Sequence, residues 1–174
     1  MSQNLERQIP EPHAPGLEYT HSKSLSHAEQ QASVARLGLR ALTGIDLSVL
    51  MREAVTTMVS GLAAEYGSIL ELLPGGEKLR IRENVGWKYH AEGTLVDARN
   101  GSAAGYTLIR NEPVIANDLS SETRFRVHQL SLDHKATGSI SVVIPGKDRP
   151  FGTIGAVPRR AAPSPLRMPT LFRR

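Results

Sequence analysis

The chain has 174 residues, of which 40% are apolar, and this suits a single folded domain with tails. It contains no cysteine, which excludes disulfide bonds, thiolate metal sites, thiol catalysis and thioether-linked cofactors. No apolar run reaches the roughly 18 residues that a membrane-spanning helix needs, and the N-terminus lacks the plan of a signal peptide. We therefore expect a cytoplasmic protein without membrane insertion.

The formal net charge of +4 arises at the end of the chain. Five arginines and no acidic residue follow Pro158, and without them the net charge is −1. A nucleic-acid-binding domain usually carries its basic residues on a folded face. We therefore expect no nucleic-acid partner.

Both ends of the chain differ in composition from its centre. Residues 1–28 have few large apolar groups, which indicates a flexible leader, and the domain itself is expected over 29–157. Residues 158–174 hold four prolines too closely spaced for a long helix, which predicts a disordered basic tail. We expect that the ancestral pattern stops near Val157, by truncation or a changed reading frame, and that no output domain follows.

Two helices are predicted at the start of the domain. Over 30–43, Val34, Leu37 and Ala41 share one side of a helix. Over 46–64, Asp46 can cap a helix whose apolar residues recur at alternating spacings of three and one. That unbroken stripe predicts a helix packed on the rest of the domain.

The remainder reads as short strands with one irregular insertion. Strands are predicted over 66–73 and 78–85, joined by a tight turn, and over 94–96 and 112–119. Ser102 can cap a short helix through Arg110, and a loop with one helical turn is expected over 120–136. The hairpin "GSISVVIPGKDRPFGTIGAV" follows at 138–157. The fold class is therefore α+β: a central, mostly antiparallel sheet of five to six strands with the N-terminal helices packed on one face.

The order of several short motifs resembles that of a GAF domain. These are Glu112–Pro113–Val114, the Asn117–Asp118–Leu119 turn, Arg124–Phe125 and the "VVIPG…PFGTIG" hairpin. From about Gln30 to Val157 the chain resembles the sensory GAF modules of bacterial histidine kinases. The resemblance implies a GAF/PAS-like sheet with helices on one face and a ligand cavity on the other, roofed by the irregular segment. Members of the family bind cyclic nucleotides, tetrapyrroles, haem or small metabolites, or serve as dimerisation modules.

Six residues are candidates for lining that cavity, and no catalytic or metal-binding set is predicted. The candidates are Trp87, Tyr106, Phe125, His128, Ser139 and Ser141. Trp87 fits either a pocket lid or an aromatic residue packed on the sheet edge. Phe125 fits a core position beside an Arg124–Asp118 ion pair, and His128 fits a hydrogen-bonded or solvated ring better than a metal ligand.

The register of the 138–157 hairpin bears on the two serines. If residue 145 lies opposite 150, the face that holds Ile140, Val142 and Ile144 also holds Phe151 and Thr153. The opposite face then carries Ser139 and Ser141 with the following residues of the hairpin: Val143, Gly152, Ile154 and Ala156. Its small polar character leaves room for a ligand.

The sequence favours a regulatory role over catalysis. A GAF-like enzyme that reduces free methionine sulfoxide uses cysteines, and most phytochromes attach their bilin to one, so neither chemistry fits this chain. We expect a small-molecule-sensing GAF domain of a two-component-type signalling protein, homodimeric through its N-terminal helices, with an unidentified ligand. The alternative is a dimerisation and relay module that binds no small ligand.

Overall fold

The computed structural model describes residues 26–88, 91–99 and 101–158. Nearly all of the predicted leader, and the tail beyond Pro158, lie outside these residues. In chain order the elements are α1 His27–Leu42, α2 Leu47–Gly61, β1 Ala64–Leu72, β2 Lys78–Val85, β3 Leu95–Asp97, α3 Ala103–Arg110, β4 Val114–Ala116, α4 Gln129–Asp133, β5 Ser139–Ile144 and β6 Gly152–Pro158.

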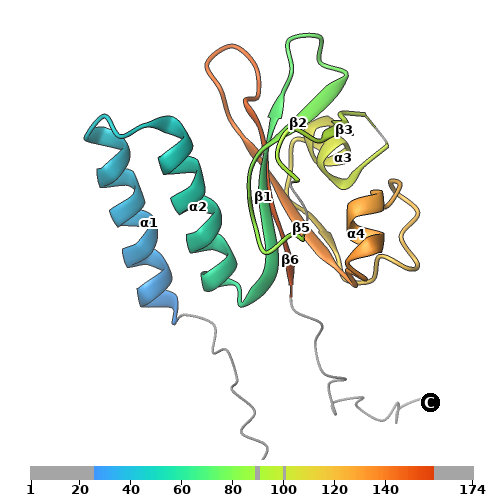
Figure 1. Ribbon diagram of the computed structural model, residues 1–174, viewed down its shortest axis with the longest axis horizontal. Coiled ribbons are helices and arrows are strands. Elements are labelled where there is room, and N and C mark those ends of the chain that lie inside the picture. Colours follow the sequence, from blue (N-terminus) through green and yellow to red (C-terminus); the bar gives the residue numbers. More distant parts are fainter. Residues whose placement is uncertain (1–25, 89–90, 100, 159–174) are drawn as a thin grey trace, which may run out of the picture.

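The strands form one six-stranded sheet in the order β3-β2-β1-β6-β5-β4. Every pair of neighbouring strands is antiparallel. The helix pair α1–α2 lies on one side of this sheet, and α3 and α4 lie on the other (Figure 1). The predicted α+β class is confirmed.

Both N-terminal helices begin at capping residues. The Ser26 side chain accepts a hydrogen bond from the Glu29 amide while the Glu29 carboxylate accepts one from the Ser26 amide, so α1 starts three residues earlier than predicted. The Asp46 carboxylate accepts from the amides of Ser48 (2.9 Å) and Val49 (3.3 Å), as predicted for the start of α2. None of the helices in the described ranges is long and apolar enough to cross a membrane.

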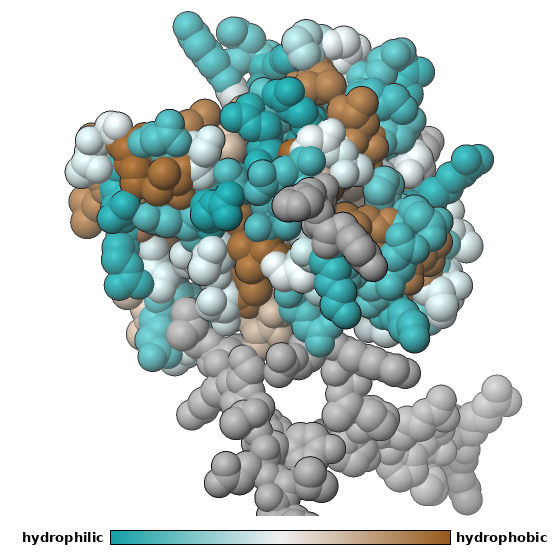
Figure 2. Space-filling model, viewed as in Figure 1, coloured by the Kyte–Doolittle hydropathy of each residue, from teal (hydrophilic) through white to brown (hydrophobic). Residues whose placement is uncertain are grey.

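The two helices contribute differently to the core. Val55 of α2 is fully buried and packs with Met51 and with Ile69 of β1, so the predicted stripe does cover the sheet. Helix α1 lies outside α2, away from the sheet (Figure 1). Its predicted apolar side is not buried in this chain, since Val34 is 66% exposed and Leu42 is 84% exposed. Exposed apolar side chains are visible over the helix pair, at the left of Figure 2.

On the opposite face, short elements and loops replace a continuous helix. The Ser102 side chain accepts from the Gly105 amide and starts α3 as predicted. The strand predicted over 112–119 spans only Val114–Ala116. It ends early because the Asp118 carboxylate accepts hydrogen bonds from the amide and hydroxyl of Ser120, which turns the chain away from the sheet.

The register of the β5–β6 hairpin differs by one residue from the prediction. Val142 lies opposite Ile154, and from Gly152 onward each β6 residue therefore occupies the face opposite to the predicted one. Thr153 belongs to the face that carries Ser139 and Ser141, while Ile154 packs beneath α2. The β5 residues keep their predicted faces. The difference arises in the loop before β6, where sequence alone did not specify how many residues separate the paired positions.

Candidate functional site

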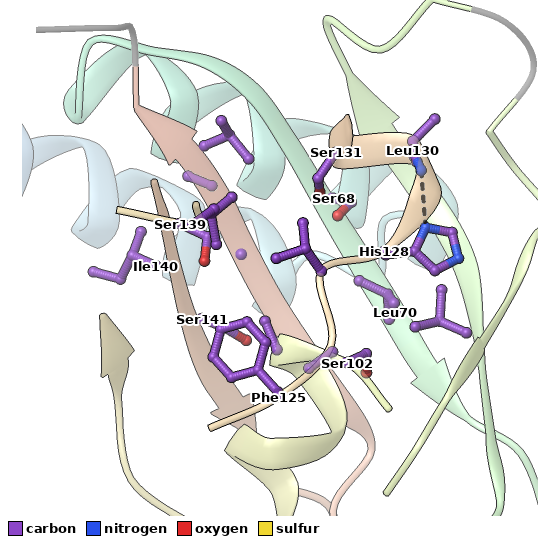
Figure 3. A pocket seen from close by; sticks show the side chains of 18 of the residues that line it. Ser68, Leu70, Ser102, Phe125, His128, Leu130, Ser131, Ser139, Ile140 and Ser141 are labelled. Atoms are coloured by element: carbon purple, nitrogen blue, oxygen red, sulfur yellow. Dashed lines mark hydrogen bonds between the residues drawn. The ribbon is translucent and has the colours of Figure 1, made fainter. Parts of the chain in front are cut away.

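A cavity of about 110 Å³ lies between the sheet and the segments that cover its second face. Its floor comes from β1, β5 and β6, and its roof from α3 and from the segment that leads into α4 (Figure 3). Thirteen of the lining side chains are apolar, among them Leu70, Ile81, Phe125 and Leu130. The polar lining consists mainly of serine hydroxyls, so the cavity is an apolar space with a few hydrogen-bonding groups.

The floor contains a row of small residues across three adjacent strands. Ser68 of β1 lies opposite Gly155 of β6, which in turn lies opposite Ser141 of β5. Ser141 is 5% exposed and lines the cavity, and no hydrogen bond involves its hydroxyl in the described residues. The Ser139 hydroxyl is also buried without a hydrogen-bond partner there. The floor thus holds hydroxyls whose hydrogen-bonding capacity is unused.

His128 occupies the start of α4 at the roof of the cavity. Its Nδ1 accepts a hydrogen bond of 3.2 Å from the Leu130 amide, drawn as a dashed line in Figure 3. Burial lowers the pKa of His128, and the nearby Asp133 carboxylate partly opposes that effect. Both the cap and the burial favour the neutral ring, because a protonated Nδ1 cannot accept a hydrogen bond.

An aromatic cluster fastens α4 to the sheet. The Trp87 ring stacks on Tyr66 with centroids 4.7 Å apart, and Trp87 Nε1 donates to the Gly67 carbonyl at 3.1 Å. The His134 ring meets both aromatic rings edge-on at 5.1 Å. Its Nε2 accepts from the Lys88 amide at 2.9 Å, so the end of α4 is bonded to the segment after β2. Trp87 packs at the sheet and also contributes to the cavity wall, while its role as a lid stays a prediction.

Arg124 fixes the roof segment, but through a different partner from the predicted Asp118. Its guanidinium pairs with the Glu122 carboxylate at 2.6 Å and donates to the Ile115 carbonyl at 2.8 Å. The hydrogen bonds from Arg124 lower the pKa of Glu122 to about 2. Asp118 instead accepts from Ser120 and Ser121, because the turn places its carboxylate over those residues. The predicted Arg124–Asp118 pair is therefore wrong.

The charged groups around the cavity are few. No carboxylate lines it. Arg126 is the only arginine or lysine in its lining, and it is exposed. Within the described residues there is no group of three or more histidine, cysteine, aspartate or glutamate side chains that could hold a metal ion. The arrangement provides hydrogen bonds and apolar contact to a bound molecule.

Comparison with known proteins links this architecture to one fold. No family model and no curated protein sequence matches the chain. Among solved structures, the GAF domain of a phosphoenolpyruvate-protein phosphotransferase from Coxiella burnetii is similar, with a TM-score of 0.66, 14% identity, and 76% of this chain and 80% of that chain covered. The nlh2 GAF domain of A. aeolicus in an inactive state is also similar, with a TM-score of 0.62 and 17% identity. The match covers 78% of this chain and 82% of that chain. This chain has the GAF-domain fold.

In another solved structure the matching fold is that of a reductase in complex with its substrate. The free methionine-R-sulfoxide reductase of Neisseria meningitidis, in complex with its substrate, matches with a TM-score of 0.64 at 12% identity, over 78% of this chain and 77% of that one. At such identities the likeness concerns the fold alone. The GAF fold by itself therefore does not separate regulatory domains from enzymes.

The GAF cavity brings together five of the six residues predicted to line it. Trp87, Phe125, His128, Ser139 and Ser141 contribute to its wall. Tyr106 does not, because the turn of α3 that carries it faces Phe125, with ring centroids 5.9 Å apart, in the core beneath β4.

Sequence reasoning missed several residues of the GAF cavity. Ser68 and Gly155 were not predicted because their place opposite Ser141 depends on strand register, which the pattern did not specify. Ser131 and Leu130 enter the wall only because α4 folds back over the sheet. A correct pairing of β5 with β6 would have identified Gly155.

Proposed function

We propose that this GAF domain is a small-molecule-sensing regulatory module of a two-component-type signalling protein, and not an enzyme. The observation that carries the proposal is the cavity whose floor holds the buried Ser139 hydroxyl, which has no hydrogen-bond partner in the described residues, beside the Ser141 side chain, which also forms no hydrogen bond there. Buried polar groups are nearly always hydrogen-bonded, and a ligand would meet that need. The absence of cysteine from the whole chain supports a role without thiol chemistry.

The proposed response connects the cavity to the helix pair through the sheet. Ser68 lines the cavity, and its neighbour Ile69 packs on Met51 and Val55 of α2. Because successive residues of a strand face opposite sides, a ligand that shifts β1 would also shift the surface on which α2 rests. The cytoplasmic location and the lack of a nucleic-acid partner stay predictions.

Thermal unfolding with candidate ligands tests the sensing role. A ligand present at 100 times its dissociation constant should stabilise the domain by about 2.7 kcal/mol. The panel should include cyclic nucleotides, haem and small metabolites. Ser139→Leu, which places an isobutyl group in the cavity, should abolish any shift, whereas the same substitution at the exposed Ser60 should preserve it. A shift that survives Ser139→Leu would place binding elsewhere.

A dimerisation and relay module is the second candidate, and a specific surface supports it. Helix α1 packs on α2 through polar contacts, including the Arg40–Glu53 ion pair of 2.8 Å, and leaves its own apolar residues exposed. Large exposed apolar groups favour association. We propose a homodimer through this surface, and Leu42→Glu should then convert the dimer into a monomer in sedimentation experiments. Ligand binding that persists in the monomer would separate the two roles.

A further inference from the structure

The unpartnered hydroxyls on the cavity floor specify what kind of group would bind there. Ser141 is 5% exposed, so its side chain is almost fully buried. Ser139, two residues earlier on the same strand, lines the same cavity (Figure 3). A hydroxyl both donates and accepts, so it pairs with a neutral hydroxyl or carbonyl group without a change in charge. No carboxylate lines the cavity, and its one arginine, Arg126, is exposed.

The volume of the cavity limits the size of its occupant. At about 110 Å³ the space is smaller than the typical 300–1,000 Å³ of a drug-sized ligand pocket. An apolar protein cavity of about 150 Å³ holds one benzene molecule. The cavity is smaller than that, so a single six-membered ring with one small substituent is the largest occupant to expect without a shift of the roof, and a nucleotide or a tetrapyrrole exceeds it.

The position of Gly155 gives this space its shape. Gly155 separates Ser68 from Ser141 in the paired row, and as a glycine it presents only backbone to the cavity. Two strand spacings of about 4.8 Å place the two serines roughly 10 Å apart across the floor. A flat ring can lie over the glycine with its hydrogen-bonding group directed toward Ser141 and Ser139 of β5.

Charge excludes one alternative class of occupant. The lining holds one arginine, the exposed Arg126, so a carboxylate buried on the serine floor away from that side chain would be strongly unfavourable. Because Arg126 is exposed, an anion paired with it would remain partly hydrated.

We propose that the cavity binds a small, uncharged, flat ring compound with a hydroxyl or carbonyl group, which lies over Gly155 and hydrogen-bonds to Ser139 and Ser141. This inference rests on the sensing role proposed above and specifies its ligand class. Phenol, toluene and benzoate are suitable probes. All three contain a six-membered ring. Phenol adds a neutral hydrogen-bonding group, toluene adds none, and benzoate adds a negative charge.

Titration of the full chain with the three probes at pH 7.5, followed by NMR spectroscopy of the amides, tests the inference. Phenol should bind more tightly than toluene or benzoate, with shifts at Ser141 and Gly155. Ser141→Ala should weaken phenol binding about three- to tenfold, the usual effect of one hydrogen bond, and leave toluene binding unchanged. Ser139→Ala is a second variant in case the first does not fold, and Ser60→Ala is the exposed control.

The outcomes separate this inference from the sensing role itself. Equal binding of phenol and toluene, unaffected by Ser141→Ala, would show that the hydroxyls do not recognise a ligand and would overturn the inference. Preference for benzoate would replace it with an anion site at Arg126. If a larger or charged metabolite stabilises the domain through the cavity while phenol does not bind, the ligand class is wrong and sensing stands. If no probe or panel compound binds, both proposals fail.

Discussion

The two faces of the sheet are covered in opposite ways. On one face, α2 presents a continuous apolar stripe, and Met51, Val55 and Ile69 form a packed core. On the other face, α3, α4 and their connecting segments leave a cavity whose floor carries serines and a glycine. Residues of the same strands therefore serve two purposes, according to which side of the sheet they face.

The difference between the two faces suggests that one mainly stabilises the fold and the other mainly binds a ligand. The helix-covered face gains stability from close packing, where even a methyl group has no free space. The loop-covered face keeps buried polar groups without partners, which a domain optimised for stability alone would lack. Substitutions on the first face should therefore destabilise the domain, whereas removal of a hydroxyl on the second should cost little stability and impair binding.

The largest effect is expected at the centre of the helix-covered face. Val55→Asp places an unpaired carboxylate at a fully buried position, so we expect a loss of about 4 kcal/mol or more and little folded protein. Thr56→Asp is the matched control, because Thr56 is the next residue and is exposed. Circular dichroism and thermal melting measure both. A normal melting temperature for Val55→Asp would mean that α2 does not pack on the sheet.

A glycine on the same face should show how tightly it is packed. A methyl group at Gly67 would lie 2.5 Å from Val59 Cγ2 and 3.0 Å from Val55 Cγ1. We expect Gly67→Ala to destabilise the domain by about 1–3 kcal/mol through overpacking. Gly38→Ala in exposed α1, where no atom lies within 4 Å, should be neutral or stabilising in the same chemical denaturation experiment. Equal stability of the two variants would contradict the difference in packing.

The sequence predicted the helix-covered face better than the cavity. The α2 stripe and the Asp46 cap are local patterns, and local patterns determine a helix without knowledge of the rest of the fold. The cavity depends on strand register and on the path of the roof, so Gly155 was missed and Tyr106 was wrongly included. Arg124 was assigned the wrong partner because two carboxylates lie within a few residues of it, and only the three-dimensional turn selects Glu122.

The roof of the cavity should respond to acid through His128. Burial lowers the pKa of His128 below its usual value of 6.5, so the fold favours the neutral ring. A lowered pKa in the folded state gives a stability contribution that is present above the unfolded value and is lost as the pH falls toward the folded one. We therefore expect the domain, and the α4 amides in particular, to lose protection from hydrogen exchange below about pH 6.5.

A substitution that keeps the cap isolates this effect. Asparagine also accepts a hydrogen bond at the first position of a helix but does not titrate, so His128→Asn should remove part of the pH dependence and retain α4. Comparison with the unaltered chain cancels the contribution of every other titratable group. Identical pH profiles for the two proteins would show that His128 does not couple the roof to pH.

The smallest effect on stability is expected from Ser141→Ala, and its contrast with Ser102→Ala makes it informative. Both serines line the cavity and both are buried. The Ser102 hydroxyl accepts from the Gly105 amide at 2.9 Å and donates to the Asp97 carbonyl at 2.6 Å, so its loss should cost about 1–2 kcal/mol. The Ser141 hydroxyl has no such partner in the described residues, so Ser141→Ala should change the stability of the ligand-free domain by less than about 1 kcal/mol, in either direction. Urea denaturation of both variants measures the difference, and a loss at Ser141 as large as that at Ser102 would mean that its hydroxyl already has a structural partner and is not held available for a ligand.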